Sequence, residues 1–177
     1  MLRKKRTYSS WSDKSLYTAG ATMEAVVRFC KDYMDHLEQK ENLDLTSSYD
    51  ELLLWTVAFF YYLIDRWAHE ELKENREIFM QNFDKSIVKE IKSQFDLKDE
   101  DVSLIADNLQ EKTNYFAPFA KTIFPEKDVS PKGTLLWELD KVFMSKLNCS
   151  IGSTLFANEM LLFYLGALNP MIRKAIK

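Results

Sequence analysis

The sequence predicts an all-α protein: a single-domain bundle of about six or seven helices packed around a buried central helix over residues 49–72. Two observations support this fold class. Gly and Pro are scarce, with four of each in 177 residues, which disfavours a fold with many tight turns. Apolar residues also recur at helical spacing along most of the chain. At this length one domain buries roughly 70% of its unfolded surface, so no metal or disulfide is needed for a core.

The predicted central helix begins with a capping box and continues into an uncharged segment. Ser48 would cap the helix, while Glu51 would reach back to the free N–H groups of the first turn. The 13 residues of 52–64 include no charge, Gly or Pro, and their apolar side chains lie all round the helix. A bilayer span needs roughly 20 such residues. We therefore expect a buried core helix and no transmembrane segment.

Further amphipathic helices are expected around this one, over residues 20–39, 75–95, about 96–116, 131–147 and 154–165. Pro118 would end the third of them, and Ser130-Pro131 has the form of a cap and first-turn proline for the fourth. Gly166 is a candidate C-cap for the last, after which Pro170 would open a short basic tail helix.

Charge is distributed unevenly along the chain. Residues 1–17 carry +4 and residues 170–177 carry +3, so within a net charge of −3 the body between them carries −10. An acidic body argues against nucleic-acid binding, which needs a basic face. We expect residues 1–17 to form a basic tail before a single helical domain over residues 18–177. Such a tail usually does nothing specific, although it could contact a membrane surface, a nucleic acid or an acidic partner.

The sequence also predicts a cytoplasmic protein. The basic start is followed by no apolar segment of the kind found in secretory signals. Cys30 and Cys149 have no metal-like spacing, and we expect free, mostly buried thiols in a reducing compartment. A single disulfide between them is the alternative.

One polar cluster occurs where the central helix changes from apolar to polar. Helical spacing places Tyr62, Asp65, Arg66 and His69 on one sector. An Asp beside a His can raise its basicity for acid–base chemistry, and an Arg beside a Tyr can bind a carboxylate or phosphate. A solvated helix face is the commoner meaning of such a cluster. We take the four as candidate ligand-binding residues and assign no catalytic residue.

Metal and cofactor signals are weak in this sequence. Asp32 and His36 repeat the Asp-x-x-x-His spacing, but they lie opposite the apolar stripe of their own helix. The Glu-x-x-His signature of di-iron bundles is absent from the sequence, as are a glycine-rich phosphate loop and a Gly-x-Ser-x-Gly elbow. We therefore expect no metal and no cofactor.

These features predict a non-catalytic soluble protein that acts by binding, as a homodimer through the apolar helix at residues 154–165. A second hypothesis is a receptor for a small apolar or amphipathic ligand. Its aromatic-lined pocket would have Arg66 at its mouth and would be lined by Phe59, Phe60, Tyr61, Tyr62 and Met160. A third hypothesis is an enzyme using an Asp65/His69 acid–base pair, and a fourth is a peripheral binder that uses the basic tails.

Overall fold

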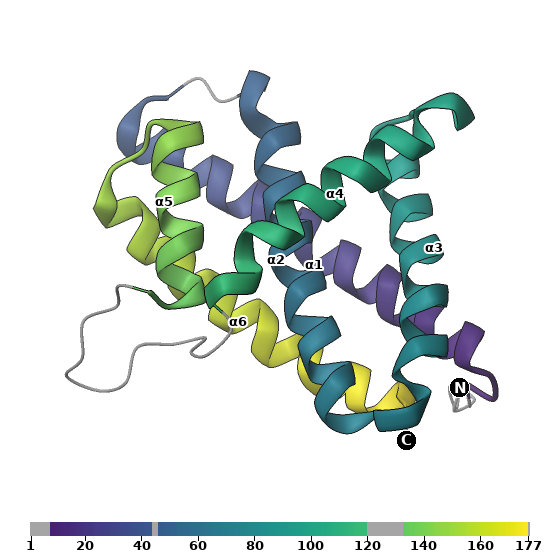
Figure 1. Cartoon of the computed structure of the whole chain (residues 1–177). Helices are drawn as coiled ribbons and strands as arrows, with labels where there is room; N and C mark the ends of the chain where they lie inside the picture. The colour runs from purple at the N-terminus through teal and green to yellow at the C-terminus, as the bar shows by residue number, and fades with distance from the viewer. Residues whose placement is uncertain (1–7, 44–45, 120–132, 177) are drawn as a thin grey trace, which may run out of the picture.

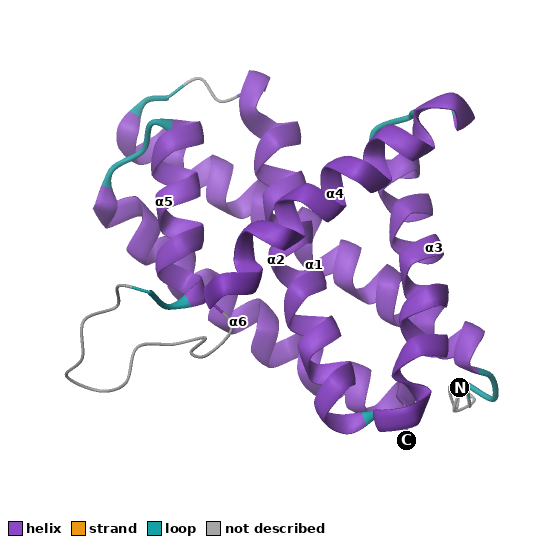
Figure 2. Ribbon diagram, in the orientation of Figure 1, coloured by secondary structure: helices purple, strands orange, loops and turns teal. Residues whose placement is uncertain are grey.

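The all-α fold class is confirmed. The computed structural model describes residues 8–43, 46–119 and 133–176, and within these residues there are six α-helices and no strand (Figures 1 and 2). The helices are α1 (Trp11–Glu41), α2 (Tyr49–Glu71), α3 (Arg76–Gln94), α4 (Val102–Phe116), α5 (Leu135–Leu147) and α6 (Ile151–Ile176). Short 3₁₀ turns precede α2, α3 and α4, and another follows α4.

Helix α2 is the central helix, with nearly the bounds expected from the sequence. It packs against α1, α3, α4 and α5, and Figure 1 shows it in the middle of the bundle with α4 crossing in front. Leu53, Val57, Phe59 and Phe60 are fully buried. Burial of one such side chain stabilises the fold by about 1.5–3 kcal/mol, so this helix contributes a large part of the core.

The capping box predicted at Ser48 and Glu51 is wrong. Ser48 ends a 3₁₀ turn with helical dihedrals, φ −105° and ψ −4°, and its side chain accepts no capping hydrogen bond. An N-cap needs an extended conformation, which the preceding turn excludes. Glu51 instead accepts a hydrogen bond from Trp55 Nε1 at 2.9 Å and from Lys112 Nζ at 3.2 Å.

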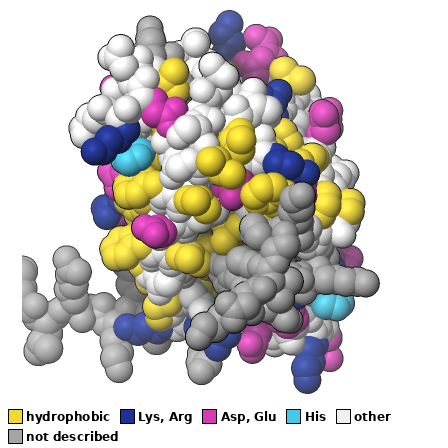
Figure 3. All heavy atoms as spheres, turned by 90° about the vertical axis from the view of Figure 1, so that its left-hand side faces the viewer, with side chains coloured by type: hydrophobic (Ala, Val, Ile, Leu, Met, Phe, Trp, Pro, Cys, Tyr) yellow, Lys and Arg dark blue, Asp and Glu magenta, His cyan; other side chains and the backbone are white. Residues whose placement is uncertain are grey.

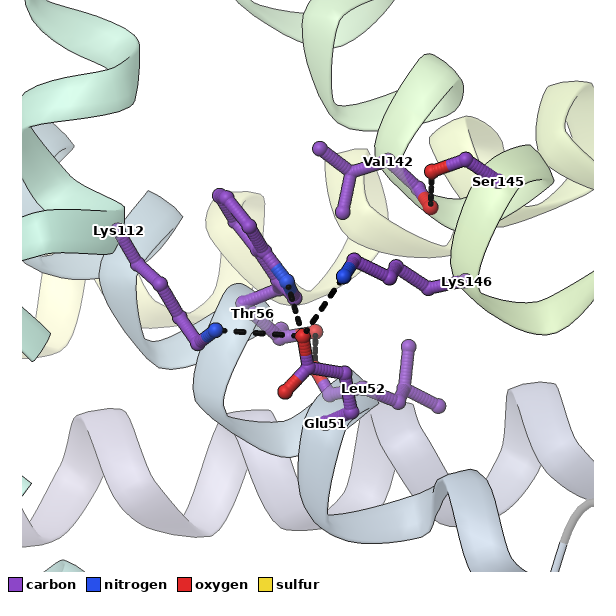
Figure 4. A network of polar contacts seen from close by, with 8 residues as sticks. Glu51, Leu52, Thr56, Lys112, Val142, Ser145 and Lys146 are labelled. Carbon is purple, nitrogen blue, oxygen red and sulfur yellow. Dashed lines mark hydrogen bonds and ion pairs between the residues drawn. The ribbon is translucent and has the colours of Figure 1, made fainter. Parts of the chain in front are cut away.

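Glu51 joins three helices (Figure 4). Its carboxylate on α2 pairs with Lys112 of α4 and lies 3.6 Å from the Lys146 ammonium of α5. Lys112 also lies over the ring of Trp55, 4.5 Å from the centroid. Burial alone would raise the pKa of the Glu51 carboxyl, but the Trp55 hydrogen bond and the lysine charges lower it overall.

Helix α1 is longer than the predicted helix at residues 20–39. It begins at Trp11, inside the segment expected as a tail, because the side chain of Ser10 caps it by accepting from Asp13 N at 3.1 Å. Ser15 is fully buried and donates to the Phe79 carbonyl of α3 at 2.9 Å. The first turns of α1 are therefore docked on α3, while residues 1–7 lie outside the described residues.

Helix α5 starts later than predicted. Its N-cap is Thr134, whose hydroxyl accepts from Trp137 N at 3.2 Å. Ser130 and Pro131, which we expected to open this helix, lie outside the described residues.

Helix α6 is one continuous helix and not a core helix followed by a short tail helix. It starts where the Glu41 carboxylate accepts the backbone N–H of Ser150, and it contains both Gly166 and Pro170. Pro170 cannot donate to the carbonyl of Gly166 four residues earlier. Because both residues are exposed, water can satisfy that carbonyl, and the helix continues through the proline.

Both cysteines are free and buried, as the sequence predicted. Cys30 contacts the Thr56 hydroxyl at 3.7 Å, and Cys149 lies 3.5 Å from the Tyr33 hydroxyl. Burial raises the pKa of Cys30 to about 12, so this thiol is held in its unreactive form.

Candidate interaction surface

Of the four residues predicted as a binding site, Tyr62 lies close enough to Asp65 and Arg66 for their charges to act on its pKa, whereas Asp65 and His69 are not paired. Asp65 turns to α3, where its Oδ1 lies 2.5 Å from Nη2 of Arg76. Arg66 pairs with Glu70, and the exposed His69 makes no hydrogen bond or ion pair with Asp65 among the described residues. Arg76 on the facing helix carries a guanidinium that is always charged, and this is the group that pairs with Asp65. The acid–base geometry expected from the spacing is therefore not formed.

The Asp65–Arg76 pair belongs to a polar contact between α2 and α3 that the sequence analysis missed. Tyr61 Oη donates to Asp84 Oδ1 at 2.5 Å, next to that pair. Burial raises the pKa of Tyr61, and its hydrogen bond to Asp84 adds to the effect; burial likewise raises the pKa of Asp84. No sequence signal pairs these residues, since they lie on different helices. Together they fasten α2 to α3.

Helix α6 carries the largest group of exposed apolar side chains. Of the ten large hydrophobic side chains that are exposed among the described residues, six belong to α6. They are Ile151, Leu155, Phe156, Leu162, Phe163 and Met171, and Phe163 is 72% exposed. Figure 3 shows hydrophobic side chains gathered over the side of the molecule where α5 and α6 lie. An exposed apolar group of this size is typical of an interaction site.

The two sides of α6 differ sharply. Buried residues face the bundle: Thr154, Ala157, Leu161, Leu168 and Ile172. The opposite side is exposed, and between Ile151 and Pro170 its single charged residue is Glu159. At a rise of 1.5 Å per residue this face is about 30 Å long. The sequence predicts an apolar helix at residues 154–165, and in the structure its exposed face extends further in both directions.

Helix α1 borders this face, and its Asp32 and His36 both contact side chains of α6. Tyr164 Oη donates to Asp32 Oδ2 at 2.5 Å, and the His36 ring stacks on Phe156 with centroids 3.9 Å apart. Burial, followed by the hydrogen bond to Asp32, raises the pKa of Tyr164 to about 12. Within the described part of the chain, no group of three or more His, Cys, Asp or Glu residues could hold a metal ion.

A separate apolar pocket of about 200 Å³ lies between α2 and α6. Its lining comprises Phe60, Leu63, Ile64, Trp67, Leu165, Leu168, Asn169, Ile172 and Arg173. Of the residues expected to line an aromatic pocket, Phe60 is found here, whereas Phe59 is packed into the core. Arg173, and not Arg66, is the arginine beside this pocket.

Comparison of the chain with known protein families, with curated proteins and with solved structures finds no match. Because six of the ten exposed large hydrophobic side chains lie on it, the exposed face of α6 is the feature of the described residues that most directly indicates an interaction.

Proposed function

We propose that the protein has no catalytic activity of its own and acts by self-association through the exposed face of α6. The observation that supports this proposal is the exposure of Ile151, Leu155, Phe156, Leu162 and Phe163 on one helix. Burial of each such side chain stabilises a complex by about 1.5–3 kcal/mol before the costs of association. A helix face about 30 Å long is also large enough to form much of a standard interface, which buries roughly 800 Å² on each partner.

A second protein surface fits this face better than a lipid bilayer. By length and composition α6 is apolar enough to cross a membrane, and only 28% of its most apolar segment is buried in the bundle, so the charges on and beside the helix decide between the two surfaces. Glu159 lies within the exposed sector, and a carboxylate at that position would be costly in hydrocarbon. The charged side chains of α1 that border α6, Asp32 among them, would also have to enter the lipid. A protein partner can offer a cation to Glu159 and polar groups to the border.

Sedimentation velocity over a wide range of protein concentration tests this function. We expect the wild-type chain to form dimers, and we expect Phe163→Ser or Leu155→Gln to weaken the dimer by about tenfold, because an exposed anchor contributes about 1–2 kcal/mol when buried at an interface. The matched control is Leu104→Gln, since Leu104 is 66% exposed on α4 and lies away from α6. This control should dimerise like the wild type.

A wild-type chain that remains monomeric at every concentration would overturn this function. The membrane alternative predicts cosedimentation with vesicles of phosphatidylcholine and phosphatidylserine, lost in Phe163→Ser. Vesicle binding by a monomer would identify α6 as a membrane surface instead of a dimer interface.

The second candidate function, a receptor for a small apolar or amphipathic ligand, is supported by the pocket between α2 and α6. Its walls are mainly apolar, and its lining includes the polar atoms of Trp67, Asn169 and Arg173. Trp67 Nε1 is buried and has no hydrogen-bond partner in the described part of the chain. Quenching of Trp67 fluorescence by a fatty acid, absent in Trp67→Phe, is the measurement that separates a receptor from a self-associating protein.

A further inference from the structure

The exposed face of α6 contains a regular seam. Leu155, Glu159, Leu162, Gly166, Asn169 and Arg173 are separated alternately by four and three residues, and all six are exposed. This is the spacing of residues that meet a partner helix along one line, as in a coiled coil. The seam therefore has a defined direction along α6, with an acidic residue near one end and a basic residue near the other.

The charges on this seam are complementary to themselves in one orientation. Glu159 and Arg173 each lie seven residues from Gly166. If two copies cross antiparallel at Gly166 about a two-fold axis, each Glu159 faces the partner's Arg173, and two identical ion pairs form. A parallel pairing would instead place Glu159 against the partner's Glu159, which costs several kcal/mol of like-charge repulsion.

Gly166 suits the crossing point. Among the residues that the structure describes, a Cβ atom built at this position would meet nothing within 4 Å, and the backbone is helical there. The chain's own packing therefore has no need of a glycine, although glycine inside a helix costs about 0.5–1 kcal/mol relative to alanine. Close approach of a second backbone is a physical reason for a glycine at an exposed helical position.

Arg173 is able to change partners. Its Nη2 lies 3.5 Å from Glu71, and both side chains are about half exposed. Such a surface pair contributes about 0–1 kcal/mol, so little is lost when the guanidinium turns toward a carboxylate of a docked copy.

We propose that two copies of the chain pair through α6 in an antiparallel arrangement, with Gly166 at the crossing and an ion pair from Glu159 to the partner's Arg173 on either side. This proposal rests on the proposed function and adds the partner's orientation and register to it.

Charge reversal tests the register. Glu159→Arg and Arg173→Glu should each weaken dimerisation by about tenfold or more, because each places two pairs of like charges across the interface. The double variant exchanges the charges and should restore an affinity close to that of the wild type. The controls are Glu111→Arg on α4 and Lys89→Glu on α3, which reverse a charge at exposed positions away from α6. Both controls should dimerise normally.

Gly166→Leu separates folding from pairing. Since a Cβ atom at this exposed position meets no atom of the described residues within 4 Å, circular dichroism and thermal unfolding should show a fold at least as stable as the wild type, while the dimer is lost. Dimers that tolerate the leucine, or charge variants whose double mutant stays as weak as the singles, would overturn the register and leave self-association intact. A monomeric wild type would overturn both proposals.

Discussion

Asp140 lies buried between α5 and α6, with 4% of its surface exposed. Its Oδ2 accepts a hydrogen bond from Asn158 Nδ2 at 2.9 Å, while its Oδ1 has no partner among the described residues. Burial penalises the charged form and raises the pKa of this carboxyl from 3.8 to about 6, although the Asn158 hydrogen bond opposes the shift. At neutral pH the folded protein therefore holds an ionised carboxylate that its surroundings stabilise poorly.

We predict that Asp140→Asn stabilises the protein at neutral pH. The folded state binds the Asp140 proton more tightly than the unfolded state, so stability from this group is full below about pH 4 and is lost as pH rises through about 6. A loss of about 3 kcal/mol is expected as the pH rises through that window to neutral. Urea unfolding of the wild type and of Asp140→Asn at several pH values measures this loss. The unfolding free energies of the two proteins should converge at about pH 4. Parallel pH curves for the two proteins would contradict the assignment.

The starts of α2 and α5 illustrate how helix caps act at the scale of the element. Both helices are preceded by a hydroxyl residue, but only the Thr134 side chain accepts a capping hydrogen bond; Ser48, in a helical conformation, does not. The difference depends on the conformation of the preceding backbone and not on residue type.

Thr134→Ala should therefore destabilise the protein by about 1 kcal/mol, because the Trp137 N–H loses its acceptor. The matched variant Ser48→Ala should change stability by only a few tenths of a kcal/mol, since no capping bond is removed. Chemical denaturation of the two variants side by side provides the measurement. Equal losses would mean that Ser48 caps α2 in solution.

At the scale of the whole molecule, the Glu51 network connects helices that are distant in sequence. Lys112 keeps only 11% of its side chain exposed and depends on the Glu51 carboxylate for charge compensation. Glu51→Gln would leave this ammonium group partly buried without a counter-ion.

We expect Glu51→Gln to cost about 1–2 kcal/mol of unfolding free energy, reduced from the value for a fully buried pair because Glu51 is itself partly exposed. Glu24→Gln is the control, since the Glu24–Arg28 pair is 60–67% exposed and lies within one helix. It should cost no more than about 0.5 kcal/mol. If thermal unfolding shows the same loss for both variants, the network does not hold α2, α4 and α5 together.

The fold class and the central helix were predictable because they depend on local properties of the chain. An uncharged run of 13 residues without Gly or Pro has few structures open to it in water other than a buried helix. The apolar helix near the C-terminus was predictable for the same reason. Its length was not, because whether Pro170 breaks the helix depends on the hydration of the Gly166 carbonyl, which tertiary packing determines.

The sequence by itself determined the all-α fold class, the central helix and which helices are apolar, since helical periodicity is a property of neighbouring residues. Only the tertiary structure decided which charges meet: Asp65 with Arg76 and Glu51 with Lys112. It also decided which side of α6 stays exposed. These outcomes depend on how helices cross, and crossing places together residues that no local spacing relates.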